Sequence, residues 1–101
     1  SDTVIGLIIG FRKTKKGYIR SLYVDPDYQG SGLGTKLVES AEAWLGNIPI
    51  HLEVVTYNHK AITFYKKLGF VETSIPPRDP IILKSGKRIP EMTMMRSTTS
   101  K

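Results

Sequence analysis

The sequence contains no cysteine and no long hydrophobic run, and each absence excludes a class of protein. Without cysteine there is no disulfide framework, thiolate nucleophile or cysteine-ligated zinc site. No stretch approaches the roughly 18 apolar residues that a membrane-spanning helix needs, and no secretory signal pattern opens the chain. The two histidines, His51 and His59, do not indicate a metal site by themselves. We therefore expect a cytoplasmic protein that binds neither a metal nor a membrane.

Acidic residues are also scarce, because 15 Lys and Arg stand against 9 Asp and Glu, which leaves a net charge of +6. Taken by itself, this excess would suit any anionic partner, whether nucleic acid, a membrane surface or a phosphate-bearing cofactor. A short basic run, from Arg12 to Lys16, is either part of such a site or a solvated loop. With 101 residues, of which 40% are hydrophobic, we expect one globular domain at 1–96 and a polar tail at 97–101.

The first half of the chain predicts a β-hairpin. The nearly continuous apolar run from Val4 to Phe11 is typical of a strand covered on both faces. Residues 12–17 predict a polar turn in which Gly17 is able to adopt a positive φ. Tyr18 to Val24 is rich in β-branched and aromatic residues and predicts the antiparallel partner strand.

The rest of the chain alternates helical and strand patterns, which predicts a mixed α/β (α+β) fold of order β-β-α-β-α-β-β. Apolar residues at helical spacing predict a helix that ends at Gly46, and Asn58 is the expected N-cap of a second helix that ends at Gly69. The first helix has the apolar stripe Leu33, Leu37, Val38, Ala41 and Leu45. The later strands are expected at Ile48–Val55, Phe70–Ile75 and near Glu91–Arg96.

A glycine-rich segment, Gln29–Gly34 (QGSGLG), lies between the second predicted strand and the first predicted helix. Such a turn exposes backbone N–H groups at the positive end of a helix dipole, which suits a phosphate group. The nucleotide P-loop and the dinucleotide fingerprint both require other glycine spacings. From the residues alone, a phosphate site and a loop that is merely tight remain open.

Two segments resemble the GNAT superfamily of acetyl-CoA-dependent N-acetyltransferases. Gln29–Gly34 is similar to the family's Gln/Arg-x-x-Gly-x-Gly/Ala signature, and the preceding LYVDPDY is similar to its strand exit. The segment NHKAITFYKKLGF, from Asn58 to Phe70, is similar to its later helix. Together they cover about residues 20–95 and imply a mixed, mostly antiparallel sheet flanked by two helices.

The resemblance implies that acetyl-CoA is the cofactor. Its pyrophosphate would lie over the glycine segment, held mainly by backbone N–H groups, and its pantetheine arm would lie along the end of the second strand, with the second helix contributing the opposite wall. The cofactor-binding residues implied are Leu22, Tyr23, Val24, Gln29, Gly30, Ser31, Gly32, Leu33, Gly34, Thr35, Asn58, Phe64 and Tyr65.

The chemistry implied is direct attack of a primary amine on the thioester in a ternary complex. Tyr65 matches the family tyrosine that protonates the departing thiolate, and the alternative is that it only packs in the core. No glutamate occurs at 18–24, so the general base is left open among Glu53, Glu72, His51 and an ordered water.

The expected function is therefore N-acetyltransferase activity on an amine acceptor, a small molecule or a protein amine. A catalytically inactive CoA-binding domain is the main alternative, and a small RNA-binding module, suggested by Lys16–Tyr23, fits less well because Arg20 stands where a stacking aromatic is needed. Compared with the family, the chain begins at a later strand, so we expect a fragment, a minimal domain or a dimer. Because the apolar strand at Val4–Phe11 needs a partner, we expect a homodimer or self-association.

Overall fold

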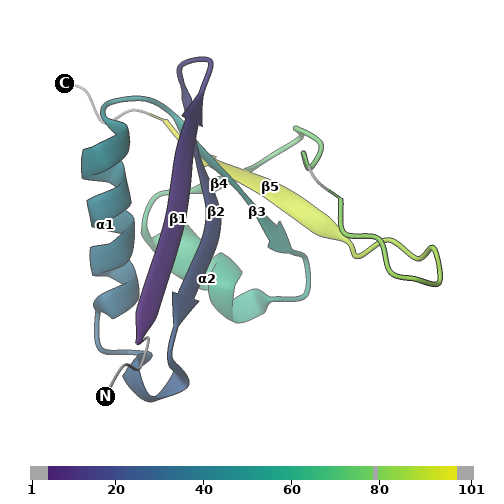
Figure 1. Cartoon of the computed structure of the whole chain (residues 1–101), viewed down its shortest axis with the longest axis horizontal. Coiled ribbons are helices and arrows are strands. Elements are labelled where there is room, and N and C mark those ends of the chain that lie inside the picture. Colours follow the sequence, from purple (N-terminus) through teal and green to yellow (C-terminus); the bar gives the residue numbers. More distant parts are fainter. Residues whose placement is uncertain (1–4, 79, 98–101) are drawn as a thin grey trace. The chain divides into compact units, whose positions relative to one another are not determined.

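The computed structural model describes residues 5–78 and 80–97 (Figure 1). Its elements follow the predicted order, with one short 3₁₀ helix added. They are β1 (Gly6–Lys13), β2 (Lys16–Val24), η1 (Pro26–Tyr28), α1 (Leu33–Leu45), β3 (Ile50–Val55), α2 (His59–Lys67), β4 (Val71–Thr73) and β5 (Glu91–Arg96). The mixed α/β fold class is therefore confirmed. The described residues fall into two compact units, 5–50 with 97, and 51–96.

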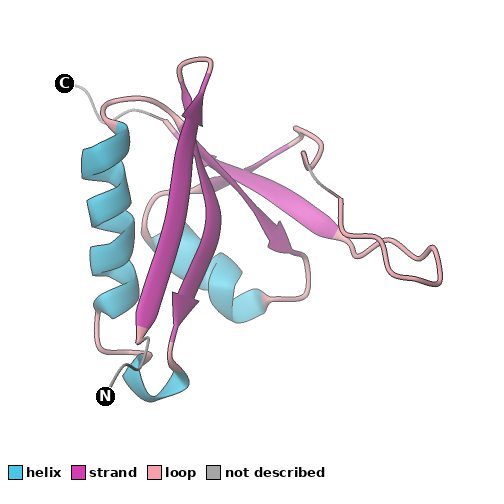
Figure 2. Ribbon diagram, viewed as in Figure 1, coloured by secondary structure: helices cyan, strands magenta, loops and turns pink. Residues whose placement is uncertain are grey.

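The first unit is the β1–β2 hairpin with α1 packed on one of its faces (Figure 2). The strands pair antiparallel from Gly6↔Val24 to Lys13↔Lys16, with an irregularity between Ile9 and Gly10. As the apolar stripe predicts, α1 buries Val38, Ala41 and Leu45. The fit is close, because a Cβ added at Gly6 would lie 3.0 Å from side-chain carbons of both Leu33 and Leu37.

The turn of this hairpin differs from the prediction. We expected a six-residue link with a positive φ at Gly17, but the positive φ values are at Thr14 (54°) and Lys15 (63°), which form a two-residue turn. Both φ values are those of a turn whose twist matches that of the strands it joins. Gly17 instead lies buried in β2, where a Cβ would come within 3.1 Å of Leu45 Cδ1. Glycine is needed there for space.

The expectation that the first strand is covered on both faces is also wrong. Exposure alternates along β1, and Leu7 and Ile9 are 48% and 41% exposed. The helix α1 contacts the hairpin from one side, which leaves the side chains that point to the other side more accessible. The basic run from Arg12 to Lys16 extends over the end of the hairpin, where its cations are exposed.

The second unit contains β3, α2, β4 and β5. The strand β5 lies between β3 and β4, and it pairs antiparallel with β4 from Val71↔Met95 to Thr73↔Thr93. The core contains apolar residues from every helix and strand of the unit except β4, and Phe70 and Met94 are the most deeply buried. Its other buried apolar residues are Leu52, Val54, Ile62 and Tyr65.

Two strands are shorter than predicted. The strand β3 begins at Ile50 rather than Ile48, next to Pro49, which has no N–H to donate to a ladder. The strand β4 ends at Thr73 rather than Ile75, because the Ile75 N–H donates to Thr73 Oγ1 (3.2 Å) instead of to a neighbouring strand.

Some predicted features lie outside the described residues, namely Val4 of the first strand and positions 98–101 of the polar tail. Within 5–78 and 80–97, no helix has the length and hydrophobicity to cross a membrane.

Candidate functional site

The glycine segment is built on a capped turn after β2. The Asp25 side chain accepts a hydrogen bond from the Asp27 N–H (2.9 Å), and Pro26 occupies the first helical position of η1. The Asp25 N–H in turn donates to the carbonyl of Ile5 (2.8 Å) beside the start of β1. In the sequence, Asp25-Pro26 was expected only to end a strand, although an acidic N-cap followed by proline is also a helix-start signal.

Gly30 and Gly32 have φ values of 84° and 88°, a left-handed conformation that side chains other than glycine rarely adopt. A Cβ added at either glycine would meet no atom within 4 Å. The chain itself therefore leaves open space over both glycines. Glycine is required at these two positions because φ is positive, and not because a side chain would clash with the protein. This is the kind of surface over which a phosphate group can approach the backbone.

Gly32 is the N-cap of α1, and it has no side chain with which to cap the helix. The first intrahelical hydrogen bond runs from the Lys36 N–H to the Gly32 carbonyl (3.1 Å). The N–H groups of Gly34 and Thr35 precede this bond and have no carbonyl partner within the helix. No acidic residue lies in the first turn to neutralise the positive end of the helix dipole. The helix start can therefore accept an anion.

The side chains of the segment stabilise the turn. Gln29 Nε2 donates to the Val24 carbonyl at the end of β2 (3.2 Å), and the Ser31 hydroxyl donates to the Tyr28 carbonyl. The Leu33 N–H is directed to Ser31 Oγ (3.4 Å). Gln29 and Ser31 were expected to bind the cofactor, and these local contacts were not predicted. Polar residues beside glycines are a signal for such contacts with the backbone.

The end of β2 lies next to this turn in the same unit. Leu22 and Val24 pair with Ile8 and Gly6 of β1 and are half-buried, whereas Tyr23 is 44% exposed. The first unit thus brings together the predicted residues from Leu22 to Thr35 on consecutive elements.

The remaining predicted cofactor residues lie on α2 in the second unit. Asn58 caps the helix as predicted, since its side-chain oxygen accepts a hydrogen bond from the Ala61 N–H (3.2 Å). That bond uses the amide oxygen and leaves the amide NH₂ group as a donor. The side chain is exposed, so the amide can reach a ligand.

Tyr65 is buried with 8% of its surface exposed, between two other aromatic rings. Its ring makes edge-to-face contacts with Phe64 and Phe70, at centroid distances of 5.4 and 5.7 Å. Desolvation raises the pKa of Tyr65 from 10.0 to about 12. The phenol is thus firmly protonated at neutral pH. It therefore keeps the proton that a hydrogen-bond donor needs.

The three side-chain candidates for the general base differ in environment. Glu53 is half-buried on β3, and its Oε2 accepts a hydrogen bond from the Arg78 N–H, which ties the loop after β4 to β3. His51 is buried, with 6% of its surface exposed, while Glu72 is exposed on β4. The burial and contacts of these three side chains do not identify which of them is the general base.

Arg96, at the end of β5, has a structural role that the sequence did not predict. Its Nη1 donates to the Leu68 carbonyl (3.0 Å) just after α2, and its guanidinium lies 5.6 Å from the centre of the Phe70 ring. A Cβ at Gly69, where φ is 95°, would come within 3.2 Å of Arg96 Cδ. Arg96 therefore holds the end of the helix that carries Tyr65. The basic residue at the end of an apolar strand gave no signal of this contact.

Comparison with known proteins gives consistent results. The family model described as the acetyltransferase (GNAT) family matches residues 1–70. An uncharacterised N-acetyltransferase of Methanocaldococcus jannaschii is 37% identical over 71 residues, which is 67% of this chain and 31% of that protein. The peptidyl-lysine N-acetyltransferase YjaB of Escherichia coli is 34% identical over 65 residues, 64% of this chain and 43% of that protein.

Solved structures share the fold. Ard1 from Thermoplasma volcanium superposes with a TM-score of 0.78 at 29% identity, covering 97% of this chain and 66% of that one. The ribosomal-protein-S18-alanine N-acetyltransferase of E. coli superposes with a TM-score of 0.74 at 27% identity, covering 96% of this chain and 63% of that one. The chain spans less than half the length of these two sequence relatives, 31% and 43% respectively.

Proposed function

The chain belongs to the acetyltransferase (GNAT) family, and we propose that it transfers an acetyl group from acetyl-CoA to a primary amine. The single observation that carries the proposal is the turn at Gln29–Thr35, where two left-handed glycines precede a helix whose first N–H groups lack intrahelical partners. This arrangement fits the pyrophosphate of acetyl-CoA. A solved protein of the same fold, from Thermoplasma acidophilum, is described as a complex with coenzyme A.

In this proposal, the backbone N–H groups of Gly34 and Thr35 bind the pyrophosphate, and Gln29 and Ser31 keep the turn in shape through their bonds to Val24 and Tyr28. The exposed Tyr23 and its neighbours Leu22 and Val24 are the proposed contacts for the pantetheine arm. Asn58 is a further proposed contact, through its free amide hydrogens.

The thioester supplies an activated acetyl group, which a neutral amine can attack directly. We assign to Tyr65 the task of donating a hydrogen bond to the departing sulfur. With its pKa near 12, full proton transfer to a thiolate of ordinary pKa, about 8.5, is unfavourable in the unliganded protein. A hydrogen bond that strengthens as negative charge develops on sulfur is the contribution such a phenol makes best.

An amine acceptor follows from the family, and the relatives include a peptidyl-lysine N-acetyltransferase and a thialysine N-epsilon-acetyltransferase. The identity of the acceptor, the homodimer and a cytoplasmic location stay predictions. The general base stays open among Glu53, Glu72, His51 and water.

The first experiment is a calorimetric titration of the 101-residue chain with acetyl-CoA, CoA and NADH. We expect saturable binding of both CoA forms and none of NADH. The second step measures the release of free CoA in the presence of primary amines. Binding without release of CoA would support a domain that binds CoA without catalysis, and a folded chain that binds neither CoA form would contradict the cofactor assignment.

A further inference from the structure

The loop between β4 and β5 contains a small ordered hairpin, which we call the arm (residues 81–89). It extends beyond the start of β5 (Figure 1). The Ile89 N–H donates to the Ile81 carbonyl and the Leu83 N–H to the Lys87 carbonyl, both at 2.8 Å. A tight turn at Lys84–Gly86 closes the arm, with a φ of 87° at Gly86. At its base, the Pro90 carbonyl accepts a hydrogen bond from the Thr56 N–H (3.0 Å).

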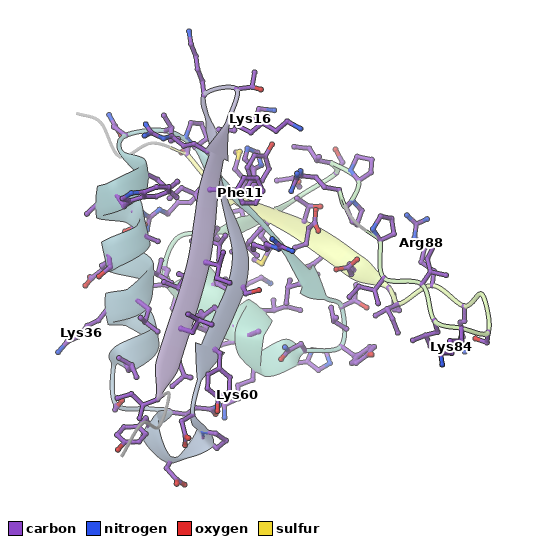
Figure 3. All side chains as sticks on the ribbon, in the orientation of Figure 1. Phe11, Lys16, Lys36, Lys60, Lys84 and Arg88 are labelled. Carbon is purple, nitrogen blue, oxygen red and sulfur yellow. The ribbon has the colours of Figure 1, made fainter. Side chains whose placement is uncertain are left out.

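The arm exposes both large aliphatic and cationic side chains. Ile81, Ile82 and Leu83 are 46%, 64% and 45% exposed, although side chains of this size are normally buried. Lys84, Lys87 and Arg88 are exposed as well, and Lys84 and Arg88 are visible on the arm in Figure 3. The sequence from 80 to 90 contains no acidic residue. Exposed apolar groups gathered on an ordered projection mark an interaction surface.

Strand pairing within the arm places one aliphatic and one cationic side chain together on each of its two faces. Ile82 and Arg88 form an antiparallel bridge between the two hydrogen-bonded pairs, so their side chains stand close together on one face. Leu83 and Lys87 are similarly opposite each other on the other face. Each face thus presents an aliphatic group next to a cation. In addition, the backbone N–H and C=O groups of Ile82 and Arg88 point outward from the arm.

We propose that the arm binds an extended acidic polypeptide segment that carries large apolar side chains. Such a segment can pair with the outward backbone groups at the arm's edge, as strands do in β-augmentation. Its carboxylates would lie by Lys87 and Arg88 and its apolar groups by Ile82 and Leu83. Within the described residues, none of the arm's three cations has an ion-pair partner of its own.

Two other partners match this surface less well. A membrane requires the aliphatic groups to insert together, but here they are divided between two faces and the tip carries Lys84 and Lys87. A nucleic acid would use the cations, but the arm has no aromatic side chain on which a base can stack. The combination of aliphatic and cationic groups favours an acidic and apolar peptide.

The test is the binding of fluorescein-labelled peptides of about ten residues to the full 101-residue chain, measured by anisotropy without acetyl-CoA. The probe repeats the pattern Glu-Glu-Leu-Leu, which places both residue types on each face of an extended chain, as the arm's two mixed faces require. One control peptide has serine in place of leucine, and a second has lysine in place of glutamate. We expect the glutamate–leucine peptide to bind at least about tenfold more tightly than either control. Its affinity should fall with added salt, because screening weakens exposed charge pairs.

The variant K84A/K87A/R88A should weaken this binding by about tenfold or more. The matched control is K13A/K15A/K16A, which removes the same charge from the tip of the β1–β2 hairpin, marked by Lys16 in Figure 3, and should bind as the parent does. A further variant, I82S/L83S, should also lose binding while its circular dichroism spectrum stays unchanged, since both side chains are exposed.

Equal losses in the two triple variants would overturn the proposal, as would equal binding of all three peptides. Arm-dependent binding of phosphatidylserine vesicles or of single-stranded RNA, without binding of the glutamate–leucine peptide, would assign the arm to that other partner and also overturn it. None of these results depends on acetyl transfer, so the proposed enzymatic function stands or fails separately.

Discussion

Gly17 of β2 lies directly against Leu45, the last residue of α1: a Cβ added at Gly17 would be 3.1 Å from Leu45 Cδ1 and 3.4 Å from Ile50 Cγ1. The Gly17 N–H also donates to the Pro49 carbonyl (2.8 Å). This position therefore joins the hairpin, the end of the helix and the start of β3 within the first unit.

We expect Gly17→Ala to lower the free energy of unfolding by about 1–3 kcal/mol, because the added methyl group overpacks a filled space. The measurement is urea denaturation. In the L45V background, where Cδ1 is absent, the same substitution should cost clearly less, which is the coupling expected of two groups in contact. Additive costs in the two backgrounds would contradict the proposed contact.

Gly32→Glu should abolish the binding of acetyl-CoA, because a carboxylate would occupy the open space over the turn and repel the phosphates. The substitution also strains a residue whose φ is 88°. Gly86→Glu is a matched control, since Gly86 has a φ of 87° and equally open surroundings. We expect both variants to lose similar stability but only Gly32→Glu to lose affinity in calorimetry. Unchanged affinity in Gly32→Glu would remove the phosphate site from this turn.

The raised pKa of Tyr65 predicts how stability changes at alkaline pH. The unfolded phenol loses its proton near pH 10, whereas the folded one keeps it until about pH 12, so the folded state binds more protons between these values. The free energy of unfolding should therefore fall by about 2–3 kcal/mol as pH rises from 10 to 12. Tyr65→Phe should lack this part of the decrease.

Tyr65→Phe also tests the proposed role in catalysis. The substitution keeps the aromatic contacts with Phe64 and Phe70 and removes only the hydroxyl. We expect kcat to fall by about 10- to 100-fold, while the affinity for acetyl-CoA changes less than threefold, because a hydrogen bond to the developing thiolate acts mainly in the transition state. Steady-state kinetics with a responsive amine would measure both values. Equal kcat in the two proteins would leave Tyr65 with a packing role alone.

At Asn58, the capping of α2 can be tested separately from the proposed contact with acetyl-CoA. Asn58→Ala removes the cap on the Ala61 N–H and should lower stability by about 1 kcal/mol. Asn58→Asp keeps the capping oxygen and should retain that stability, but it loses the amide donor proposed to contact the cofactor. We expect Asn58→Asp to bind acetyl-CoA more weakly at full stability. Full affinity in this variant would limit Asn58 to capping.

The β1 strand provides the test of self-association. It pairs with β2 along one edge and exposes Leu7 and Ile9, features that favour pairing with a second copy. Sedimentation should therefore show a dimer that L7K/I9K converts to monomer, because lysines on an edge strand oppose pairing. The control Ile75→Lys changes an equally exposed residue of the other unit and should leave the dimer intact. A parent chain that stays monomeric on concentration would contradict the homodimer.

Local signals in the sequence were sufficient to predict the helices and strands. They were also sufficient to predict the turn that we propose binds phosphate. Periodic apolar residues, the Asn58 cap and the glycines at 46 and 69 are properties of short segments, and the helices begin and end close to the predicted places. The left-handed glycines at 30 and 32 and the uncapped start of α1 likewise follow from adjacent residues.

Tertiary packing decided the rest, because it depends on residues far apart in the chain. It determined that Gly17 provides space for Leu45 instead of a positive φ, and that β1 is covered on only one side. It buried Tyr65, so that desolvation raises its pKa, and it set Arg96 against the end of α2. Segment patterns report the conformational preferences of the backbone, whereas burial, close contact and desolvation arise only when separate segments meet.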